Sequence, residues 1–315
     1  MIIIYNEKLK YNIIKFTVIM SLVRNSLFRR FIESVIWMFP DKLVIKCQYR
    51  SLVGRWPNLK NPKRFTEKVD WYKLYYRDPL MTQCVDKYLE KDYLKDKGYD
   101  EYVPKTLQVK DKIEEIEFNK LPDSFIIKCN NGYGNNVIVR DKAKMNVSEI
   151  YETFNKWHST SPVVFGREWA FINVVPKIMV EELLVSKDGT QKGDLNDYKV
   201  MCFNGVPRVV WVDIDRYSNH TRNFYTPEWE LLPVESDCPL SSYPIEKPYG
   251  LDKMLEIATN IAKDFPFVRV DFYSVNQRVY IGELTFYPWS GCVNYKPDSF
   301  DFELGDMFTL PNPRV

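Results

Sequence analysis

The sequence predicts an α+β fold built mainly on antiparallel sheets. Two pairs of short segments rich in β-branched and aromatic residues support this prediction. Residues 197–203 and 207–213 flank Asn204-Gly205, and Asn-Gly favours the type I′ turn of a tight hairpin. Residues 267–273 and 279–286 form the second pair, in which the side chains alternate between two faces. Both pairs therefore predict β-hairpins.

Helical periodicity accompanies these strands. Residues 251–265 place Met254, Ala258 and Ile261 on one face, as an amphipathic helix does. The other expected elements are helices at 12–38, 65–76, 80–96 and 148–158 and strands at 124–129, 137–140 and 177–184. This mixture of elements indicates an α+β protein.

Length and composition exclude several classes of protein. The chain has 315 residues, 45% of them hydrophobic, so we expect an ordered chain large enough for two or three lobes. Its net charge of +2 makes no case for nucleic acid. Six scattered cysteines without a C-x-x-C pair exclude a disulfide framework and a zinc site. Two histidines exclude a multi-histidine metal centre.

The amino-terminal region is basic. Residues 1–60 hold eleven Lys and Arg against three Asp and Glu. Such a segment suits an anionic membrane surface or an anionic substrate, and a solvated basic face is the alternative. Charged residues interrupt its apolar stretch before it reaches the roughly 18–20 residues that cross a bilayer. We therefore expect a cytoplasmic protein, at the inner face of the membrane if this segment binds there.

Two acids stand on the last predicted hairpin. If residues 276–278 form a three-residue turn, Asp271 lies opposite Glu283, and Arg269 lies opposite Thr285. Like charges placed directly opposite each other destabilise a sheet, and apolar neighbours increase that cost. A bound cation removes the conflict, and carboxylate oxygens on rigid strands suit Mg²⁺. The alternatives are solvated acids at a sheet edge, or a pair neutralised by Arg269 alone.

A lysine and a glycine loop form a second candidate. Lys128 stands inside an apolar strand, which is uncommon unless its ammonium group meets an anion. Gly132 and Gly134 follow among four asparagines, a backbone that can turn its N–H groups toward an anion. An ordinary Asn/Gly hairpin is the alternative. The strand ending at Glu181-Glu182 could present backbone groups to an adenine edge.

The order of these motifs along the chain is more specific than any one of them. Lys128, the glycine loop, Glu181 to Leu184, Lys199, Arg269-x-Asp271 and Glu283-x-Thr285 follow one another in an order that resembles the ATP-grasp superfamily. From residue 65 to residue 311 the chain is similar to the teichuronopeptide-biosynthesis type, or TupA-like, ATP-grasp family. The phrases that carry this resemblance are Phe65-Thr-Glu-Lys68, Trp71-Tyr-Lys-Leu74, Val85-Asp-Lys-Tyr88, Lys128-Cys-Asn130, Gly166-Arg-Glu-Trp169, Asp197-Tyr-Lys199, Arg222-Asn-Phe-Tyr225, Asp264-Phe-Pro-Phe-Val-Arg-Val-Asp271 and Gly282-Glu-Leu-Thr-Phe-Tyr-Pro288.

The resemblance implies an ATP-grasp fold, in which two α+β lobes with antiparallel sheets grip ATP. We expect a basic helical segment at 1–60, a helical part at 61–120, a smaller lobe with the glycine loop at 121–180, and a larger lobe with the Mg²⁺ and ATP site at 181–315. The family's cofactors are ATP and Mg²⁺.

Roles for single residues follow from the same resemblance. Lys128 would hold phosphates under the loop of Gly132 and Gly134, and Lys199 would also touch phosphate. The segment of Glu181, Glu182 and Leu184 would read adenine through its backbone. Asp271 and Glu283 would hold Mg²⁺. Thr285 departs from the family pattern, which generally has Asn there, although its hydroxyl oxygen can still coordinate the ion or hold a water molecule.

The resemblance also implies a reaction, the ATP-dependent joining of a carboxylate and an amine through an acyl phosphate. We expect Arg269, Lys199 and Arg222 to act on the reacting groups, because cations stabilise an acyl phosphate and a tetrahedral oxyanion. The expected residues on the carboxylate-binding side are Arg167, Arg216, His220 and Asn223. The family accompanies cell-surface polysaccharide synthesis, of capsular, teichuronic and O-antigen polymers, so the expected substrates are a uronic acid or a glycan containing one, and an amine or amino acid.

Other interpretations remain open. Asp213-x-Asp215 is the motif with which glycosyltransferases bind metal and a nucleotide sugar, although a lone D-x-D is a weak signal. A phosphotransferase and a non-catalytic scaffold of polysaccharide assembly are further alternatives. ATP binding with a phosphorylated product would indicate a phosphotransferase, and no ATP turnover would indicate a scaffold.

Overall fold

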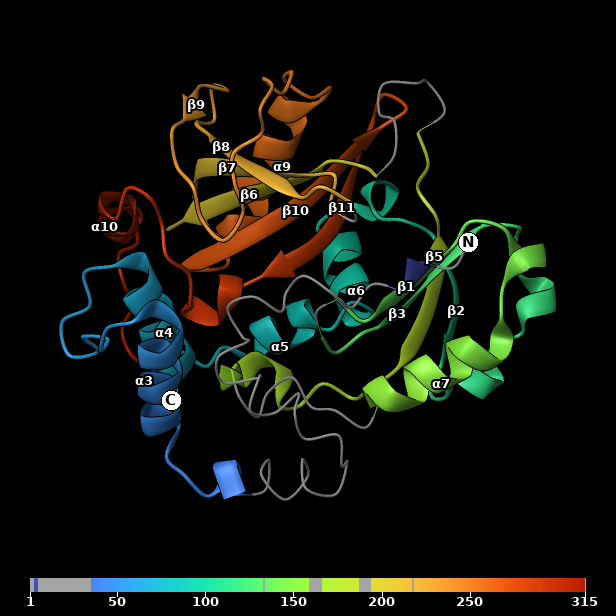
Figure 1. Cartoon of the computed structure of the whole chain (residues 1–315), viewed down its shortest axis with the longest axis horizontal. Helices are drawn as coiled ribbons and strands as arrows, with labels where there is room; N and C mark the ends of the chain where they lie inside the picture. Colours follow the sequence, from blue (N-terminus) through green and yellow to red (C-terminus); the bar gives the residue numbers. More distant parts are fainter. Residues whose placement is uncertain are drawn as a thin grey trace.

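The structure is a computed structural model that describes residues 3–4, 35–132, 134–158, 166–186, 194–216 and 218–314. The helix predicted at 12–38 lies outside these residues except for its last four. Two antiparallel sheets lie side by side, each with helices against it (Figure 1). The prediction of an α+β fold with antiparallel sheets is therefore confirmed, whereas the predicted domain boundaries stay a prediction.

The larger sheet has six strands in the order β11-β10-β6-β7-β8-β9, and every neighbouring pair is antiparallel. Its strands are β6 (Asp197–Phe203), β7 (Val206–Ile214), β8 (Thr221–Tyr225), β9 (Leu231–Leu232), β10 (Phe267–Val275) and β11 (Arg278–Thr285). Both predicted hairpins are present. Asn204 and Gly205 form the first turn with φ values of 48° and 85°, the left-handed conformation that a type I′ turn requires.

The second hairpin pairs Asp271 with Glu283 as predicted, but its turn differs from the predicted one. Val275 pairs with Arg278, so the turn has two residues, Asn276 and Gln277, and the predicted three-residue turn is wrong. The pairing shifts by one residue between Phe272 and Asp271, which leaves Gly282 as the extra residue of a β-bulge. Asp271 therefore still lies opposite Glu283, as predicted.

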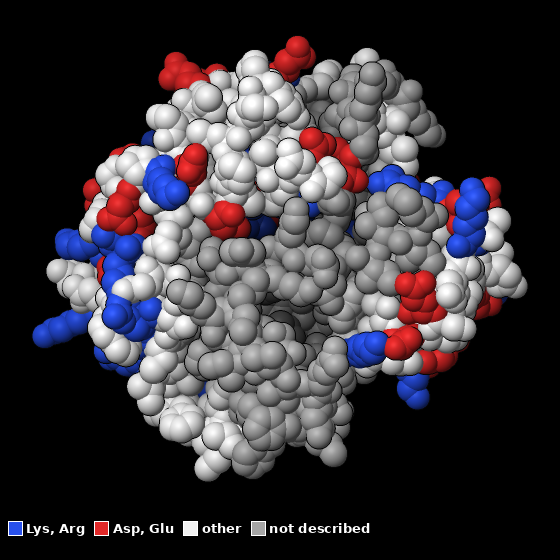
Figure 2. Space-filling view, in the orientation of Figure 1, with Lys and Arg blue, Asp and Glu red and all other residues white. Residues whose placement is uncertain are grey.

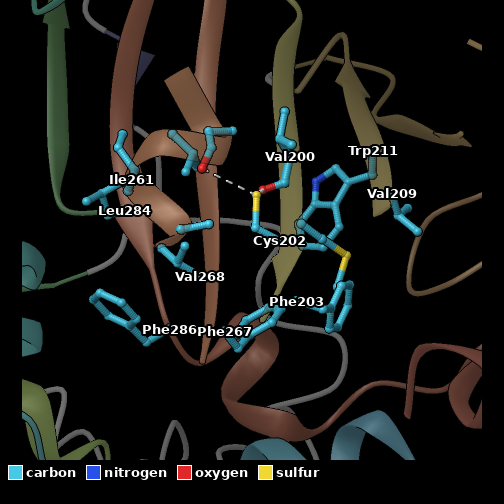
Figure 3. Packing of buried hydrophobic residues seen from close by; sticks show 14 of the residues in the cluster. Val200, Cys202, Phe203, Val209, Trp211, Ile261, Phe267, Val268, Leu284 and Phe286 are labelled. Carbon is cyan, nitrogen blue, oxygen red and sulfur yellow. Dashed lines mark hydrogen bonds between the residues drawn. The ribbon is translucent and has the colours of Figure 1, made fainter. Parts of the chain in front are cut away.

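The helix α9 (Leu251–Ala262) covers one face of the larger sheet (Figure 1). Cys202 Sγ donates a weak hydrogen bond to Ala258 O at 3.8 Å, and Val200, Val268 and Leu284 share this apolar face (Figure 3). Because side chains alternate along a strand, residues next to these point to the opposite face. Lys199, between Tyr198 and Val200, lies on that opposite face, which is where the polar residues gather.

The smaller sheet has the order β1-β4-β3-β5-β2 and is antiparallel throughout. Its strands are β1 (Ile3–Ile4), β2 (Thr106–Lys110), β3 (Phe125–Cys129), β4 (Asn136–Val139) and β5 (Ile178–Glu182). The helix α7 (Val147–His158) packs Ile150 and Phe154 into the same core as Phe125 and Val137. The glycine loop connects β3 to β4 at one end of this sheet.

The remaining helices lie between and beside the sheets. They are α3 (Asp41–Val53), α4 (Phe65–Tyr75), α5 (Pro79–Val85), α6 (Leu89–Asp96) and α10 (Ser299–Met307), with short 3₁₀ turns η1 (Asp100–Tyr102), η2 (Ile113–Glu115), η3 (Phe118–Lys120), η4 (Lys142–Lys144), η5 (Trp169–Phe171) and η6 (Pro288–Gly291). The single helix predicted at 80–96 is wrong. Asp86 accepts hydrogen bonds from the backbone N–H groups of Tyr88 and Leu89, which ends α5 and starts α6.

A buried lysine of α4 is paired within its own helix and hydrogen-bonds to η6. Lys73 Nζ lies 2.8 Å from Asp70 Oδ1, and both side chains are fully buried. The same ammonium group donates to Ser290 O at 2.8 Å and to Gly166 O at 3.0 Å. These bonds satisfy a charge that would otherwise be costly to bury, and they attach α4 to two loops.

Candidate functional site

A cluster of charged side chains lies on the polar face of the larger sheet. Lys199 on β6 is directly opposite Asp271 on β10. Its ammonium group donates to Asp271 Oδ2 at 2.6 Å and to Asp197 Oδ2 at 2.5 Å. All three side chains are buried. One cation therefore joins two strands through two carboxylates.

Arg269 closes the other side of Asp271. Its Nε donates to Asp271 Oδ1 at 2.6 Å and its Nη2 donates to Oδ2 at 2.7 Å, which is a two-pronged contact. Nη2 also donates to Thr285 Oγ1 at 2.9 Å. The guanidinium lies over the ring of Trp211 at 4.7 Å. Arg269 is thus held in one orientation beside Asp271 and Thr285, two of the three predicted metal ligands.

Glu283 is the more accessible of the two opposed acids. Its side chain is 27% exposed and lies 3.3 Å from Lys87 Nζ and 3.5 Å from Arg269 Nη2. Burial disfavours its charge, but Lys87, Lys199 and Arg269 outweigh burial and hold the pKa of Glu283 below its ordinary value. Glu283 is therefore an ionised, partly exposed carboxylate on the polar face of the larger sheet.

The donor set of the predicted metal site fits magnesium. Asp271, Glu283 and Thr285 offer carboxylate and hydroxyl oxygens, and Mg²⁺ is usually held by one or two carboxylates together with phosphate and water. Among the described residues no cluster of three or more His, Cys, Asp and Glu is placed to hold a metal. In the structure the positive charges of Arg269, Lys199 and Lys87 surround the two opposed acids, so Arg269 is not the only side chain that neutralises them.

Lys87 on the α5–α6 connection and Glu90 in the first turn of α6 also lie at the site, although no pattern in the sequence predicted them. Lys87 Nζ donates to Gly132 O at 2.7 Å, so it joins the glycine loop to Glu283. Glu90 is buried and lines a cavity of about 10 Å³ together with Glu283 and Thr285. Burial, reinforced by the charge of Glu283, raises the pKa of Glu90 well above its ordinary value. Only the packing of α6 against β11 brings these residues to the acids.

The predicted phosphate lysine has a carboxylate partner. Lys128 Nζ lies 2.5 Å from Glu181 Oε2, and Lys91 on α6 pairs with the other oxygen of the same carboxylate. Burial opposes the charge of Glu181, but Lys128 and Lys91 hold the pKa of Glu181 below its ordinary value. Lys91 is a further cation that sequence reasoning missed. Two lysines from different elements, β3 and α6, therefore meet at one carboxylate on β5 of the smaller sheet.

The glycine loop and the predicted adenine segment flank these lysines. Gly134 has a φ of 67°, a left-handed conformation that favours glycine. Asn130 Nδ2 donates to Asp86 Oδ1 at 2.9 Å, which attaches the start of the loop to the α5–α6 connection. β5 ends at Glu182, whose N–H donates to Lys105 O at 3.0 Å. Leu184 lies beyond the end of that strand.

Three of the expected substrate-binding and catalytic residues, Arg216, His220 and Arg222, contact acids next to Lys199. Arg222 Nε and His220 Nε2 lie 2.6 Å and 2.9 Å from Asp213 Oδ1. Arg216 Nη1 donates to Asp197 Oδ2 at 3.0 Å. The Arg222 guanidinium also lies over the rings of Trp211 and Trp289, at 5.4 Å and 5.0 Å. Together with Lys199, these side chains form a row across the polar face of the larger sheet.

The other two expected substrate residues have different partners. Arg167 donates to Ile36 O at 2.5 Å and pairs with Asp41 at 3.3 Å, on the amino-terminal side of the protein. Asn223 donates to the Tyr225 hydroxyl at 3.1 Å and accepts from Ser241 N at 2.9 Å. Their contacts hold loops in place, whereas Arg216, His220 and Arg222 contact the acids of the cluster.

Cations and acids thus gather on the polar face of the larger sheet, and Lys128 and Lys91 meet at Glu181 on the smaller sheet. Residues 67–309 match the sequence model of the family described as TupA-like ATPgrasp. The chain therefore belongs to the TupA-like ATP-grasp family.

Solved structures give weaker likenesses. D-alanine–D-alanine ligase from Bacillus anthracis is 19% identical, with 71% of this chain and 65% of that chain covered and a TM-score of 0.42. The ATP-grasp ligase PsnB, complexed with minimal precursor, Mg and ADP, is 12% identical, with 78% and 66% covered and a TM-score of 0.38. This chain thus spans 65% of the Bacillus ligase. A comparison with curated proteins finds no match.

Proposed function

We propose that this protein is an ADP-forming ligase that joins a carboxylate to an amine through an acyl phosphate. The observation that carries the proposal is the pair Asp271 and Glu283, opposed on one hairpin with Lys199 and Arg269 bonded to Asp271. Such a group of fixed charges is suited to a reaction whose charge develops on a transferring phosphoryl group. Membership of the family supports the same reaction class.

The chain's own residues have distinct tasks in this proposal. Asp271, Glu283 and Thr285 would hold Mg²⁺, which when bound neutralises phosphate charge. Lys128 and Lys199 would bind phosphate oxygens, and a triphosphate near Lys128 competes with Glu181 for that ammonium group. The backbone from Glu181 to Leu184 would bind the adenine edge, beside the loop of Gly132 and Gly134.

The proposed reaction has two steps. A substrate carboxylate oxygen attacks the γ-phosphorus, the bond to the β-phosphate oxygen breaks, and ADP leaves. The amine nitrogen attacks the acyl carbon, phosphate leaves with the electrons of the C–O bond, and the amine loses a proton. Arg269, fixed against Asp271, would stabilise the acyl phosphate and the oxyanion, and Arg222 on β8 would add positive charge on the same sheet.

We propose that the carboxylate is a uronic acid, or a glycan that contains one, in the synthesis of a cell-surface polysaccharide. The family resemblance supports this substrate class. Aromatic residues make up 15% of the chain, a content that suits stacking on sugar rings. Arg216 and His220, which contact Asp197 and Asp213, would bind the substrate carboxylate. Arg167 and Asn223 would act by positioning the loops around it.

An ADP-release screen over uronic acids and amino acids, followed by mass spectrometry of the products, tests the proposal. We expect ADP, phosphate and a new amide to appear together, with loss of all three in Lys128→Met. A phosphorylated product without an amide would indicate a phosphotransferase instead. Tight binding of a uridine-diphosphate sugar without ATP binding would favour the glycosyltransferase reading of Asp213-x-Asp215. No ATP turnover with any acceptor would favour a scaffold.

We also propose that the amino-terminal part of the chain contacts an anionic membrane face. Large apolar side chains are exposed there, namely Trp37, Met38, Phe39, Leu43 and Trp56. Lys and Arg side chains, together with Asp and Glu side chains, lie on the flank of the molecule around α3 (Figure 2). Among the described helices, none has the length and apolarity to cross a bilayer. Aromatic rings beside basic side chains are suited to the interface of an anionic bilayer.

Sedimentation with vesicles tests this contact. We expect binding to vesicles that contain phosphatidylserine, weak binding to neutral vesicles, and at least tenfold weaker binding for a Trp37→Ser, Phe39→Ser double variant. Equal binding to both kinds of vesicle would contradict an electrostatic contribution from Lys42 and Lys46.

A further inference from the structure

One buried side-chain amide, that of Asn130, joins three segments at the start of the glycine loop. Asn130 is completely buried. Its Nδ2 donates to Asp86 Oδ1 at 2.9 Å and to Val175 O at 3.0 Å, and its Oδ1 accepts from Lys177 N at 2.7 Å. Asp86 lies on the α5–α6 connection, and the other two partners lie on the segment that leads into β5. The amide therefore holds the end of β3 against two other parts of the chain.

The backbone of Asn130 bonds to the same two segments. Its N–H donates to Lys177 O at 3.1 Å, and its carbonyl oxygen accepts from Lys87 N at 3.2 Å. Main chain and side chain thus hold the same neighbours, and a shift of any one of the three segments breaks several of these bonds at once.

The three contacts of the side chain require an amide. The Val175 carbonyl can only accept a hydrogen bond, and Asp86 Oδ1 already acts as an acceptor for the backbone of α6. The group that faces them must therefore carry two hydrogens. The Lys177 N–H can only donate, so the other atom of the side chain must be an acceptor. Asparagine supplies both on one short side chain, whereas alanine supplies neither.

Lys87 is the side chain whose position depends on this attachment. It follows Asp86 directly in the chain, and its Nζ donates to Gly132 O at 2.7 Å and lies 3.3 Å from Glu283 Oε2. Gly132 stands two residues after Asn130, so the lysine and its carbonyl partner are both attached to the same amide. A lysine is a point charge on a flexible stem, so the position of its backbone decides which groups the ammonium can reach.

The attachment continues into α6. Asp86 Oδ1 accepts from the backbone N–H groups of Tyr88 and Leu89, at 2.9 Å and 3.3 Å, and so fixes the start of this helix. In the same helix Lys91 pairs with Glu181, the carboxylate that also holds Lys128. The cations on both sides of the glycine loop therefore depend on where the α5–α6 connection lies.

We propose that Asn130 is a positioning residue of the nucleotide site and that it acts through Lys87. The inference rests on the proposed binding of ATP and Mg²⁺ at Glu283. The amide holds the α5–α6 connection against the glycine loop, which places the Lys87 ammonium between Gly132 O and the proposed magnesium ligand, where phosphate charge would gather. Asn130 itself is fully buried, so it contacts neither the phosphates nor the metal ion.

A double-mutant cycle in nucleotide affinity tests this role. Wild type, Asn130→Ala, Lys87→Met and the double variant are titrated calorimetrically with the non-hydrolysable ATP analogue AMPPNP and Mg²⁺. We expect the Kd to rise about tenfold in Asn130→Ala, the lower end of the loss when a residue behind a ligand is changed, and at least as much in Lys87→Met. The double variant should bind within about twofold of Lys87→Met, because a residue that acts only through Lys87 has no effect once that side chain is removed.

Asn204→Ala is the matched control. The Asn204 amide also joins two segments, through Thr309 O and Thr309 N, both at 2.9 Å, but it lies in the turn after β6, away from the acids. Alanine is disfavoured at its φ of 48°, so this variant should lose stability in urea and still bind AMPPNP as wild type does. Wild-type affinity in folded Asn130→Ala, losses that multiply in the double variant, or an equal loss in Asn204→Ala overturns the role of Asn130.

Hydrogen exchange tests the positioning without any nucleotide. We expect peptides that contain Lys87, and peptides that contain Gly132 and Gly134, to exchange at least roughly tenfold faster in Asn130→Ala than in wild type, with peptides of α9 unchanged. Unchanged exchange in the first two regions overturns the inference. If Asn130→Ala does not fold, Asn130→Ser takes its place in both experiments, because serine keeps one donor and an acceptor on a short side chain.

The two experiments separate this inference from the proposed function. If wild type does not bind AMPPNP, the proposed function is wrong, and hydrogen exchange still decides whether Asn130 positions Lys87 and the glycine loop. If wild type binds AMPPNP and the losses multiply in the double variant, the role of Asn130 alone is wrong and the ligase proposal stands.

Discussion

Replacing Asp271 by Asn should destabilise the protein far more than replacing Glu283 by Gln, although the two acids face each other. Asp271 is buried and accepts from Arg269 at 2.6 Å and 2.7 Å and from Lys199 at 2.6 Å. Asn has nearly the same shape as Asp, but the substitution removes the negative charge that balances the buried cations Arg269 and Lys199. Breaking a buried pair costs about 3–5 kcal/mol. We expect about 3 kcal/mol, the lower end, because Lys199 keeps Asp197.

Glu283→Gln is the matched control. Glu283 is partly exposed and its two contacts are longer, at 3.3 Å and 3.5 Å. Lys87 also keeps its bond to Gly132 O and Arg269 keeps Asp271, so neither cation loses every partner. A partly exposed pair of this kind contributes about 1 kcal/mol or less.

Scanning calorimetry measures this contrast. An unfolding entropy of about 2.1 cal/mol/K per residue corresponds to about 0.66 kcal/mol/K for a chain of this length. The Tm should therefore fall by about 4–5 °C in Asp271→Asn and by about 1 °C in Glu283→Gln. Titration with Mg²⁺ and ATP at 25 °C should show affinity losses of at least roughly tenfold in both variants. Equal falls in Tm, or an unchanged Tm in Asp271→Asn, would refute the view that Asp271 balances the buried cations.

Three further predictions concern stability. Lys73→Met leaves Asp70 buried without its cation and should cost about 3–5 kcal/mol in chemical denaturation; a loss under 1 kcal/mol would contradict the role of this pair. Glu181→Gln should destabilise the protein at neutral pH, because Lys128 and Lys91 lower the pKa of Glu181 despite burial. The contribution of a carboxylate with a lowered pKa is present above its unfolded value of about 4.3 and is lost as pH falls through the folded value, so urea midpoints of variant and wild type should converge in acid. Gly305→Ala places a Cβ 2.0 Å from Lys63 O, which forces α10 away from the segment before α4; we expect a loss of about 1–3 kcal/mol or more by thermal melting, and an unchanged Tm would show that this contact is loose.

Local patterns in the sequence predicted both hairpins of the larger sheet. The predicted facing of Asp271 and Glu283 is right only because the unpredicted bulge at Gly282 compensates for the wrong turn length. Strand alternation determines which residues share a face, and Lys199, Arg269 and Asp271 follow from it. Lys87, Glu90 and Lys91 could not be predicted in the same way. They lie on the α5–α6 connection and on α6, more than a hundred residues before β11 in the chain, and only tertiary packing brings Lys87 and Glu90 close to Glu283 and Lys91 to Glu181.

Other differences have local causes. The helix predicted at 80–96 is interrupted because Asp86 bonds to the backbone of the next turn, a competition that helical periodicity does not register. β2, with the sequence Thr-Leu-Gln-Val-Lys, alternates polar and apolar residues as a strand does, but it is a short edge strand whose residues are all half-buried, and the sequence analysis did not predict it.

Eleven residues separate Asp271 from Glu283, and an odd number cannot pair off completely in a hairpin with a two-residue turn. One residue must stay unpaired, and it is Gly282, directly beside the acid. A three-residue turn would absorb the same residue at the tip and would leave Asp271 opposite Glu283 just as well. The odd number of residues between the two acids therefore affects them only through the position of the unpaired residue. The tip of the hairpin is attached to a neighbouring loop, because Asn276 donates to Val185 O at 2.9 Å, whereas the unpaired residue lies at the other end of the arm, next to Glu283.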